Sequence, residues 1–234
     1  MTVRWLAIFT CIISATVILA VAAFIYFSMN QAEEKITEKL PDLVSREAAK
    51  HKVIYTKLSD INPYVKEAAI ASQDERFYTN PGVDIKGTAR AIFYSLFSGH
   101  RQGASTITEQ LAKNIYYGDV DSLKTDIETK ILALYITQKY PKNSILEWYL
   151  NIIYFGHNTY GIGKAGKIYF GVQPKDLSLG EAAYLIGIIN LPGYYEKHPA
   201  QALDEAKAAL NSMVKNKYIT PEEKNQAWIK LNSE

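Results

Sequence analysis

A helix-start signature that recurs along the chain constrains the fold more than any other feature. A Ser or Thr is followed three residues later by Glu, so that the hydroxyl and the carboxylate satisfy the exposed backbone N–H groups of a first helical turn. The pairs are Thr106 with Glu109, Ser144 with Glu147, Ser178 with Glu181, and Thr220 with Glu223. A further start has Asn62 as N-cap and Pro63 in the first turn. These starts predict a mainly α fold.

Apolar periodicity agrees with these starts. Residues 122–139 place Ile127, Ile131 and Leu134 on one line, and residues 182–189 are apolar on nearly all sides, as in a central helix. The C-terminal residues predict a helix pair at 204–217 and 221–231. Residues 51–56 predict a short strand or an extended connector. The stops Gly99, Gly118, Pro141, Gly156, Gly171 and Pro192 fall where each periodic stretch ends.

The N-terminal run at 5–29 has no charged residue. At a rise of about 1.5 Å per residue, a helix of this length spans roughly 37 Å, more than the ~30 Å hydrocarbon core of a bilayer. We therefore predict a transmembrane anchor at 5–29, after cytoplasmic residues 1–4. A cleaved signal peptide is the alternative, because residues 20–22 are small enough for a cleavage site.

The charges that flank this run predict the topology. Arg4 precedes it, whereas Glu33 and Glu34 follow it, which favours a cytoplasmic N-terminus with the rest of the chain outside the cell membrane. Residues 30–60 then predict a stalk, and residues 61–234 one helical domain.

Composition excludes several other classes of protein. The net charge of +2 gives no electrostatic case for binding nucleic acid. The single cysteine excludes a disulfide framework, and the four histidines are scattered without the spacing of metal ligands. We therefore expect no protein metal site.

Two polar clusters lie on either side of a short amphipathic segment. The first, at 71–77, reads ASQDERF, and the second, at 101–110, reads RQGASTITEQ. Between them Ile85, Ala89 and Ile92 recur at three- and four-residue steps, the period of one helix face. A helix would thus separate two polar loops that line one cleft.

These motifs resemble those of the peptidoglycan glycosyltransferases, glycosyltransferase family 51, over residues 62–192. The resemblance begins at QDERF (73–77) and GASTIT (103–108). It continues at ILE (145–147), YLN (149–151), YFG (154–156), YGI (160–162) and YFG (169–171). It implies a lysozyme-like helical domain of the monofunctional, membrane-anchored type. It also implies an inverting transfer that polymerises lipid II into β-1,4 glycan strands and releases undecaprenyl diphosphate.

The resemblance assigns the catalytic positions, and this chain departs from the family at both. Gln73 stands where the family has the Glu that takes a proton from the acceptor hydroxyl. Thr129 stands at the family's second acid, with Glu128 one residue earlier. Because one residue turns a helical side chain by about 100°, Glu128 reaches the same cleft only if the helix register shifts. Alternatively, Glu128 is a surface residue paired with Lys124.

Three interpretations of Gln73 stay open. The chain is a relative that only binds substrate, Gln73 is an isolated or introduced substitution, or a neighbour such as Asp74 or Glu75 takes over as base. An amide cannot accept the proton at neutral pH, and losing a general base costs about 10² to 10⁴ in rate.

By resemblance, the substrate contacts are Asp74, Phe77, Arg90, Gly103, Ser105, Gln110, Lys113 and Asn114. Lys113 would contact the diphosphate, and Mg²⁺ or another divalent cation would arrive bound to it. Lipid II, the growing glycan chain, the membrane and other cell-wall synthesis proteins are the implied partners.

Further departures leave fewer cations around the diphosphate site than the family pattern supplies. Asn80 replaces His, Ala104 a second Gly, Glu109 Gln, Thr125 and Asp126 a basic pair, Glu128 Lys, and Thr137 Glu. A lipid II-binding relative without turnover is therefore the alternative function. A membrane-tethered helical interaction module is the other.

Overall fold

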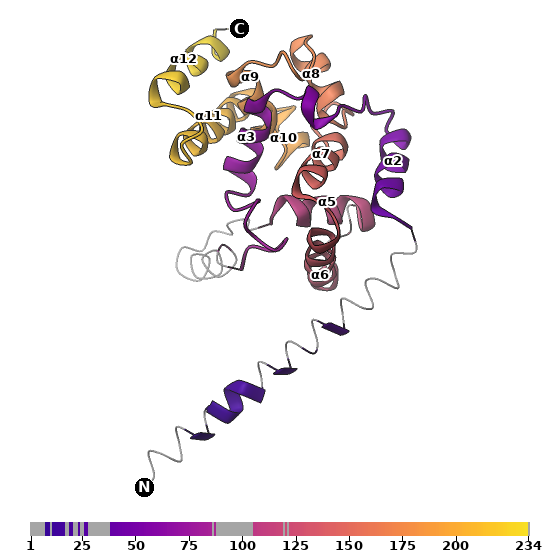
Figure 1. Ribbon diagram of the computed structural model, residues 1–234. Helices are drawn as coiled ribbons and strands as arrows, with labels where there is room; N and C mark the ends of the chain where they lie inside the picture. Colours follow the sequence, from indigo (N-terminus) through magenta and orange to yellow (C-terminus); the bar gives the residue numbers. More distant parts are fainter. Residues whose placement is uncertain are drawn as a thin grey trace.

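The structure is a computed structural model that describes residues 38–85, 87, 105–118, 120 and 122–233, with short pieces between residues 8 and 27. The described part of the chain is mainly helical, as predicted (Figure 1). Its elements are α2 (Leu40–Lys50), the 3₁₀ helix η1 (Leu58–Asp60), α3 (Pro63–Gln73), α5 (Ile107–Tyr116), α6 (Leu123–Lys139), α7 (Lys142–Ile152), α8 (Ile162–Phe170), α9 (Leu179–Ile188), α10 (Pro192–Tyr195), α11 (Pro199–Lys215) and α12 (Pro221–Leu231). Of the helix predicted between the polar clusters, only Ile85 and Gly87 are described.

Helix α9 is the centre of one half of the domain, where it packs against α3, α11 and α12. Its side chains are buried on nearly all sides, which confirms the central helix predicted from its composition. Ala202, Ala206 and Ala209 of α11 are buried as well, and such small side chains allow two helix backbones to approach closely.

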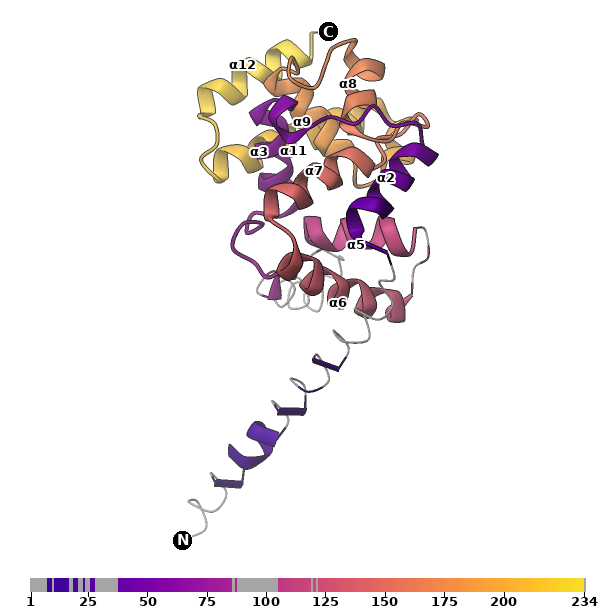
Figure 2. The same cartoon turned by 45° about the vertical axis from the view of Figure 1, so that its right-hand side comes forward.

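The other half consists of α2, α5, α6 and α7. Helix α5 packs against both α6 and α7, and α2 packs against α7 (Figure 2). Leu40 and Val44 of α2 are buried in the same core as α7 and α9, so residues 40–50 pack with the helical domain. Helix α3 joins the α9 half, and its C-terminal end leads toward α5.

The predicted helix starts differ in outcome. Ser178 with Glu181 and Thr220 with Glu223 form reciprocal capping boxes, and Asn62 caps α3 as expected. The Ser144 box is wrong, because the N-cap of α7 is Pro141, three residues before the predicted cap. The Thr106 box is half right: its hydroxyl accepts from the Glu109 N–H, but the Glu109 carboxylate turns to Lys130. An unpredicted box joins Ser122 and Thr125.

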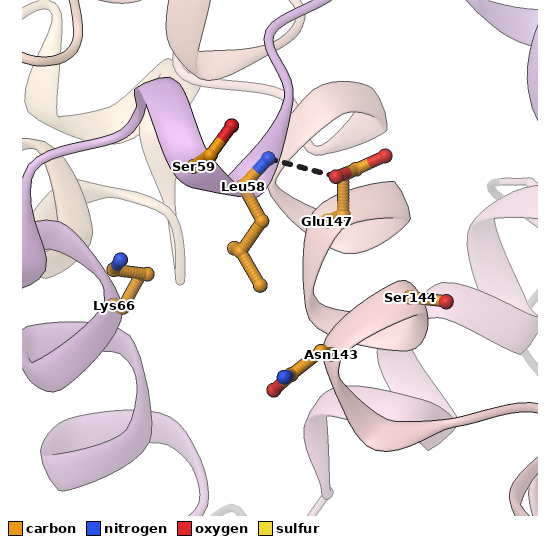
Figure 3. A pocket seen from close by; sticks show the side chains of 6 residues that line it. All are labelled: Leu58, Ser59, Lys66, Asn143, Ser144 and Glu147. Atoms are coloured by element: carbon orange, nitrogen blue, oxygen red, sulfur yellow. Dashed lines mark hydrogen bonds between the residues drawn. The ribbon is translucent and has the colours of Figure 1, made fainter.

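Residues 53–57 form an extended connector, not a strand, and no strand occurs among the described residues beyond the isolated bridge between Tyr154 and Tyr160. The connector is fixed to α7 by two side chains. Glu147 accepts from the Leu58 N–H at 2.7 Å (Figure 3), and the Asn151 amide both accepts from the Thr56 N–H and donates to the Thr56 carbonyl at 2.8 Å. The Glu and Asn of the ILE and YLN motifs thus have structural contacts.

About half of the predicted membrane anchor at 5–29 lies outside the described residues. Within the residues that the structure does describe, no helix combines the length and the apolar character needed to cross a membrane. The short described pieces are helical and their side chains are exposed. The anchor stays a prediction.

Candidate active site

Gln73 is the last residue of α3, and it meets α5 and α7 through a chain of hydrogen bonds. The Gln110 Nε2 group donates to Gln73 Oε1 at 3.2 Å, and the Tyr149 hydroxyl donates to Gln110 Oε1 at 3.1 Å. Tyr149 is fully buried. The structure thereby connects two residues that lie 37 positions apart and that the sequence placed in one cleft.

The donor and acceptor in each of these two hydrogen bonds determine which polar group of the Gln73 amide is already used. The Tyr149 hydroxyl hydrogen is buried, and Gln110 Oε1 is its acceptor among the described residues. Gln110 must then turn its NH₂ group to Gln73, whose carbonyl oxygen is used in that contact. The remaining polar group of Gln73 is its NH₂, which donates hydrogen bonds and accepts no proton.

Asp74 follows as the C-cap of α3, and both of its carboxylate oxygens have partners. Asn80 Nδ2 donates to Oδ1 at 2.8 Å and to Oδ2 at 3.0 Å, and the Ile107 N–H donates to Oδ2 at 3.3 Å. Burial raises the pKa of Asp74, while the Asn80 amide, the Ile107 N–H and the Lys142 charge lower it. Asp74 therefore joins the end of α3 to the start of α5.

The next acidic neighbours are engaged as well. Glu75 pairs with Arg76 and with Lys215, both at 3.1 Å. Arg76 also forms a salt bridge with Asp84. The Asp74 carboxylate is engaged by the Asn80 amide and the Ile107 N–H, and the Glu75 carboxylate by two cations. Neither is therefore placed as an open proton acceptor beside Gln73.

Helix α6 turns Glu128 and Thr129 in different directions. Glu128 accepts from the Tyr117 hydroxyl at 3.0 Å. Thr129 is 5% exposed, on the same buried side as Thr125 and Ala133, and its hydroxyl has no hydrogen-bond partner in the described structure. The side of α6 that packs in the domain thus carries a hydroxyl at this position.

Glu109 is a buried carboxylate on α5 that pairs with Lys130 of α6. Its side chain is 4% exposed, and Lys130 Nζ lies 2.6 Å from Oε2. The other oxygen, Oε1, is buried without a partner among the described residues, as is the Thr108 hydroxyl. Burial raises the pKa of Glu109 above its ordinary 4.5, although the Lys130 contact opposes the shift.

This raised pKa predicts the pH dependence of Glu109→Gln. A raised folded-state pKa gives stability that is present below 4.5 and is lost as the pH rises through the folded pKa. Glu109→Gln should therefore match the parent near pH 4 and exceed its free energy of unfolding by about 1 kcal/mol near pH 7. Lys130 is 38% exposed, so water replaces its lost partner at little cost.

Urea denaturation at both pH values checks this, with Glu222→Gln, an exposed change on α12, as the matched control. A loss of stability in Glu109→Gln at pH 7 would show that the ion pair outweighs the cost of burying the carboxylate.

The remaining predicted substrate contacts have varied surroundings. Phe77 is fully buried in the core, where Lys142 Nζ lies 4.7 Å from its ring centroid. Ser105 is exposed just before α5, Lys113 is half-buried on α5, and Asn114 donates to the Gln110 carbonyl at 2.9 Å. Arg90 and Gly103 lie outside the described residues.

Two contributors were missed by sequence reasoning. Tyr149 was noted as the first residue of the YLN motif, yet its hydroxyl orients Gln110. Lys142 donates to Asn80 Oδ1 at 3.1 Å and acts on the charge of Asp74, and burial lowers its own pKa. No motif singled out Lys142, because Pro141 before it was interpreted as a helix stop, whereas the structure has it as the N-cap of α7.

A hollow of about 390 Å³ lies between η1, α3 and α7 (Figure 3). Its lining is Leu58, Ser59, Lys66, Asn143, Ser144 and Glu147. None of these residues is among the predicted site residues, so this hollow is separate from the Gln73 network.

Comparison with known proteins agrees with the sequence motifs. Residues 40–214 match the Transglycosylase family. Penicillin-binding protein 1A of Neisseria lactamica is 40% identical over 183 residues, which cover 77% of this chain and 23% of that protein. Penicillin-binding protein 1A of Escherichia coli K12 is 39% identical over 190 residues, 79% of this chain and 22% of that protein. A crystal structure of penicillin-binding protein 1A from Haemophilus influenzae gives a TM-score of 0.43 at 20% identity, over 75% of this chain and 17% of that chain.

The family match and the motif order together define a transglycosylase domain. This chain belongs to the transglycosylase family, and the resemblance to peptidoglycan glycosyltransferases is confirmed. It spans about a quarter of the length of the curated relatives that it matches.

Proposed function

We propose that this domain binds lipid II where α3 ends and α5 begins, and that it transfers the glycan chain slowly because Gln73 replaces the general base. The observation that carries the proposal is the hydrogen-bond chain from Tyr149 through Gln110 to Gln73. It leaves an amide NH₂ where the reaction needs a proton acceptor.

The proposed reaction is the inverting polymerisation of lipid II into β-1,4 glycan strands with release of undecaprenyl diphosphate. In this proposal Lys113 and Arg90 hold the diphosphate through charge-assisted hydrogen bonds. The described residues contain no group of three acidic, histidine or cysteine side chains suited to a metal ion. In this proposal Mg²⁺ is carried by the diphosphate oxygens and offsets their charge.

We further propose a lysozyme-like domain, held outside the cell membrane by the predicted anchor at 5–29, near the growing glycan chain and other cell-wall synthesis proteins. A lipid II-binding relative without turnover is the second candidate. It is favoured by the engagement of Asp74 and Glu75, since neither carboxylate is open to replace the missing base.

The proposed diphosphate contact predicts that Lys113→Ala weakens lipid II binding. A charge-assisted hydrogen bond contributes about 1.5–3 kcal/mol, so the dissociation constant should rise about 10- to 100-fold. Binding of fluorescent lipid II to the full chain in detergent measures this.

Lys230→Ala, an exposed change on α12, is the control and should bind like the parent. Equal affinity in Lys113→Ala would remove this lysine from the proposed site. Absence of saturable binding in the parent as well would favour the tethered interaction module.

A further inference from the structure

A second, smaller cavity lies apart from the Gln73 network, where the turn after α7 meets α8, α9 and α10. Its volume is about 90 Å³. The side chains that line it are chiefly His157, Tyr169, Tyr184, Ile188, Tyr195 and Glu196. At about 30 Å³ for each water in the liquid, this space suits a group of a few heavy atoms.

Glu196 is fixed at this cavity by the turn at 154–160. The His157 N–H donates to its Oε1, and the Tyr154 hydroxyl donates to the same oxygen at 3.3 Å. Gly156, with a φ of +90°, makes the approach possible, because a Cβ there would lie 3.0 Å from Glu196 Oε1. No hydrogen bond reaches Glu196 Oε2 from the residues that the structure describes. One oxygen of a positioned carboxylate therefore remains available.

The hydroxyls of two of these tyrosines already have hydrogen-bond partners. The Tyr169 hydroxyl donates to the Phe155 carbonyl at 2.5 Å. Burial raises the pKa of Tyr195 to about 12, helped by a hydrogen bond to Glu205. The ring centroids of Tyr169 and Tyr184 lie 6.0 Å apart with their planes inclined at 56°, and His157 packs edge-on against Tyr169 at 5.5 Å.

We propose that this cavity binds a primary alkylammonium group, with Glu196 as its counter-ion and the tyrosine rings as its walls. Aromatic faces attract cations through their electrostatic quadrupole, and a carboxylate beside them adds a charge partner. An anion would be repelled by the nearby Glu196 carboxylate, and a purely apolar group would gain nothing from its charge. The Glu196 charge and the aromatic lining of the cavity therefore both favour a cation.

The test is a titration of the full chain with n-butylammonium chloride, followed by two-dimensional NMR of the Gly156 and His157 amides. n-Butanol serves as the neutral ligand of similar size, and NaCl controls for ionic strength. We expect saturable shifts with a dissociation constant on the order of 1–10 mM for the amine and none for the alcohol.

Glu196→Gln keeps the oxygen that accepts from His157 and removes the charge. It should weaken amine binding at least about fivefold, while Glu222→Gln on α12 should bind like the parent. The proposal is overturned by equal binding of the alcohol, by unchanged affinity in Glu196→Gln, or by no saturation of the parent up to about 100 mM amine.

Discussion

Replacing Gln73 by Glu is expected to raise the rate of lipid II polymerisation by about 10² or more. The two side chains have nearly the same shape, so the fold should tolerate the change. Gln110 Nε2 already donates to position 73 and would stabilise a carboxylate there. The second oxygen of that carboxylate would stand where the amide NH₂ is now, and would be open to accept the proton.

The assay is polymerisation of fluorescent lipid II by the parent, Gln73→Glu, and Gln73→Glu combined with Thr129→Glu. Gln138→Glu, an exposed change on α6, is the matched control and should leave the rate unchanged. A further increase in the double variant would assign the second acid to position 129. Parent-like rates in both Gln73 variants would mean that the missing base is not what limits transfer.

Gly82→Ala is expected to cost about 4 kcal/mol of stability, which lowers the melting temperature by about 10 °C in a domain of this size. Gly82 has a φ of +107°, and a Cβ would lie 2.2 Å from the Ala133 carbonyl oxygen of α6. Its N–H donates to Asn80 Oδ1, and its carbonyl accepts from the Thr106 hydroxyl at 2.6 Å. The loop cannot move away without breaking these contacts.

Gly118→Ala is the control that separates backbone strain from collision. Gly118 also has a positive φ, +55°, but nothing lies within 4 Å of the position of an added Cβ. Thermal unfolding should show a loss of about 1 kcal/mol for this variant, from the left-handed conformation alone. Equal losses in the two variants would contradict the proposed contact between the Gly82 loop and α6.

The helical fold was predictable because its signals are local. Ser178, Thr220 and Asn62 each specify a helix start through contacts within three residues. Ser144 satisfied the same pattern and misled, because Glu147 is engaged by the distant connector at Tyr55 and Leu58. A long-range contact overrode the local one there, and no periodicity in the sequence records it.

The site was predictable as a set of residues, but not as a network. The motifs placed Gln73 and Gln110 together, whereas the orientation of their amides depends on Tyr149, from a third helix. Likewise, Glu109 was predicted to cap its own helix start with Thr106 and was noted as a departure from the family pattern. Its pairing with Lys130 depends on how α5 packs against α6, which sequence spacing does not determine.

The most direct measurement follows lipid II binding and polymer formation by the unmodified chain in one sample, beside Gln73→Glu. The account predicts saturable binding by both proteins, with polymer forming at least about 10² faster in the Glu variant. Absence of binding by the unmodified chain, or polymerisation at the rate of the Glu variant, would contradict it.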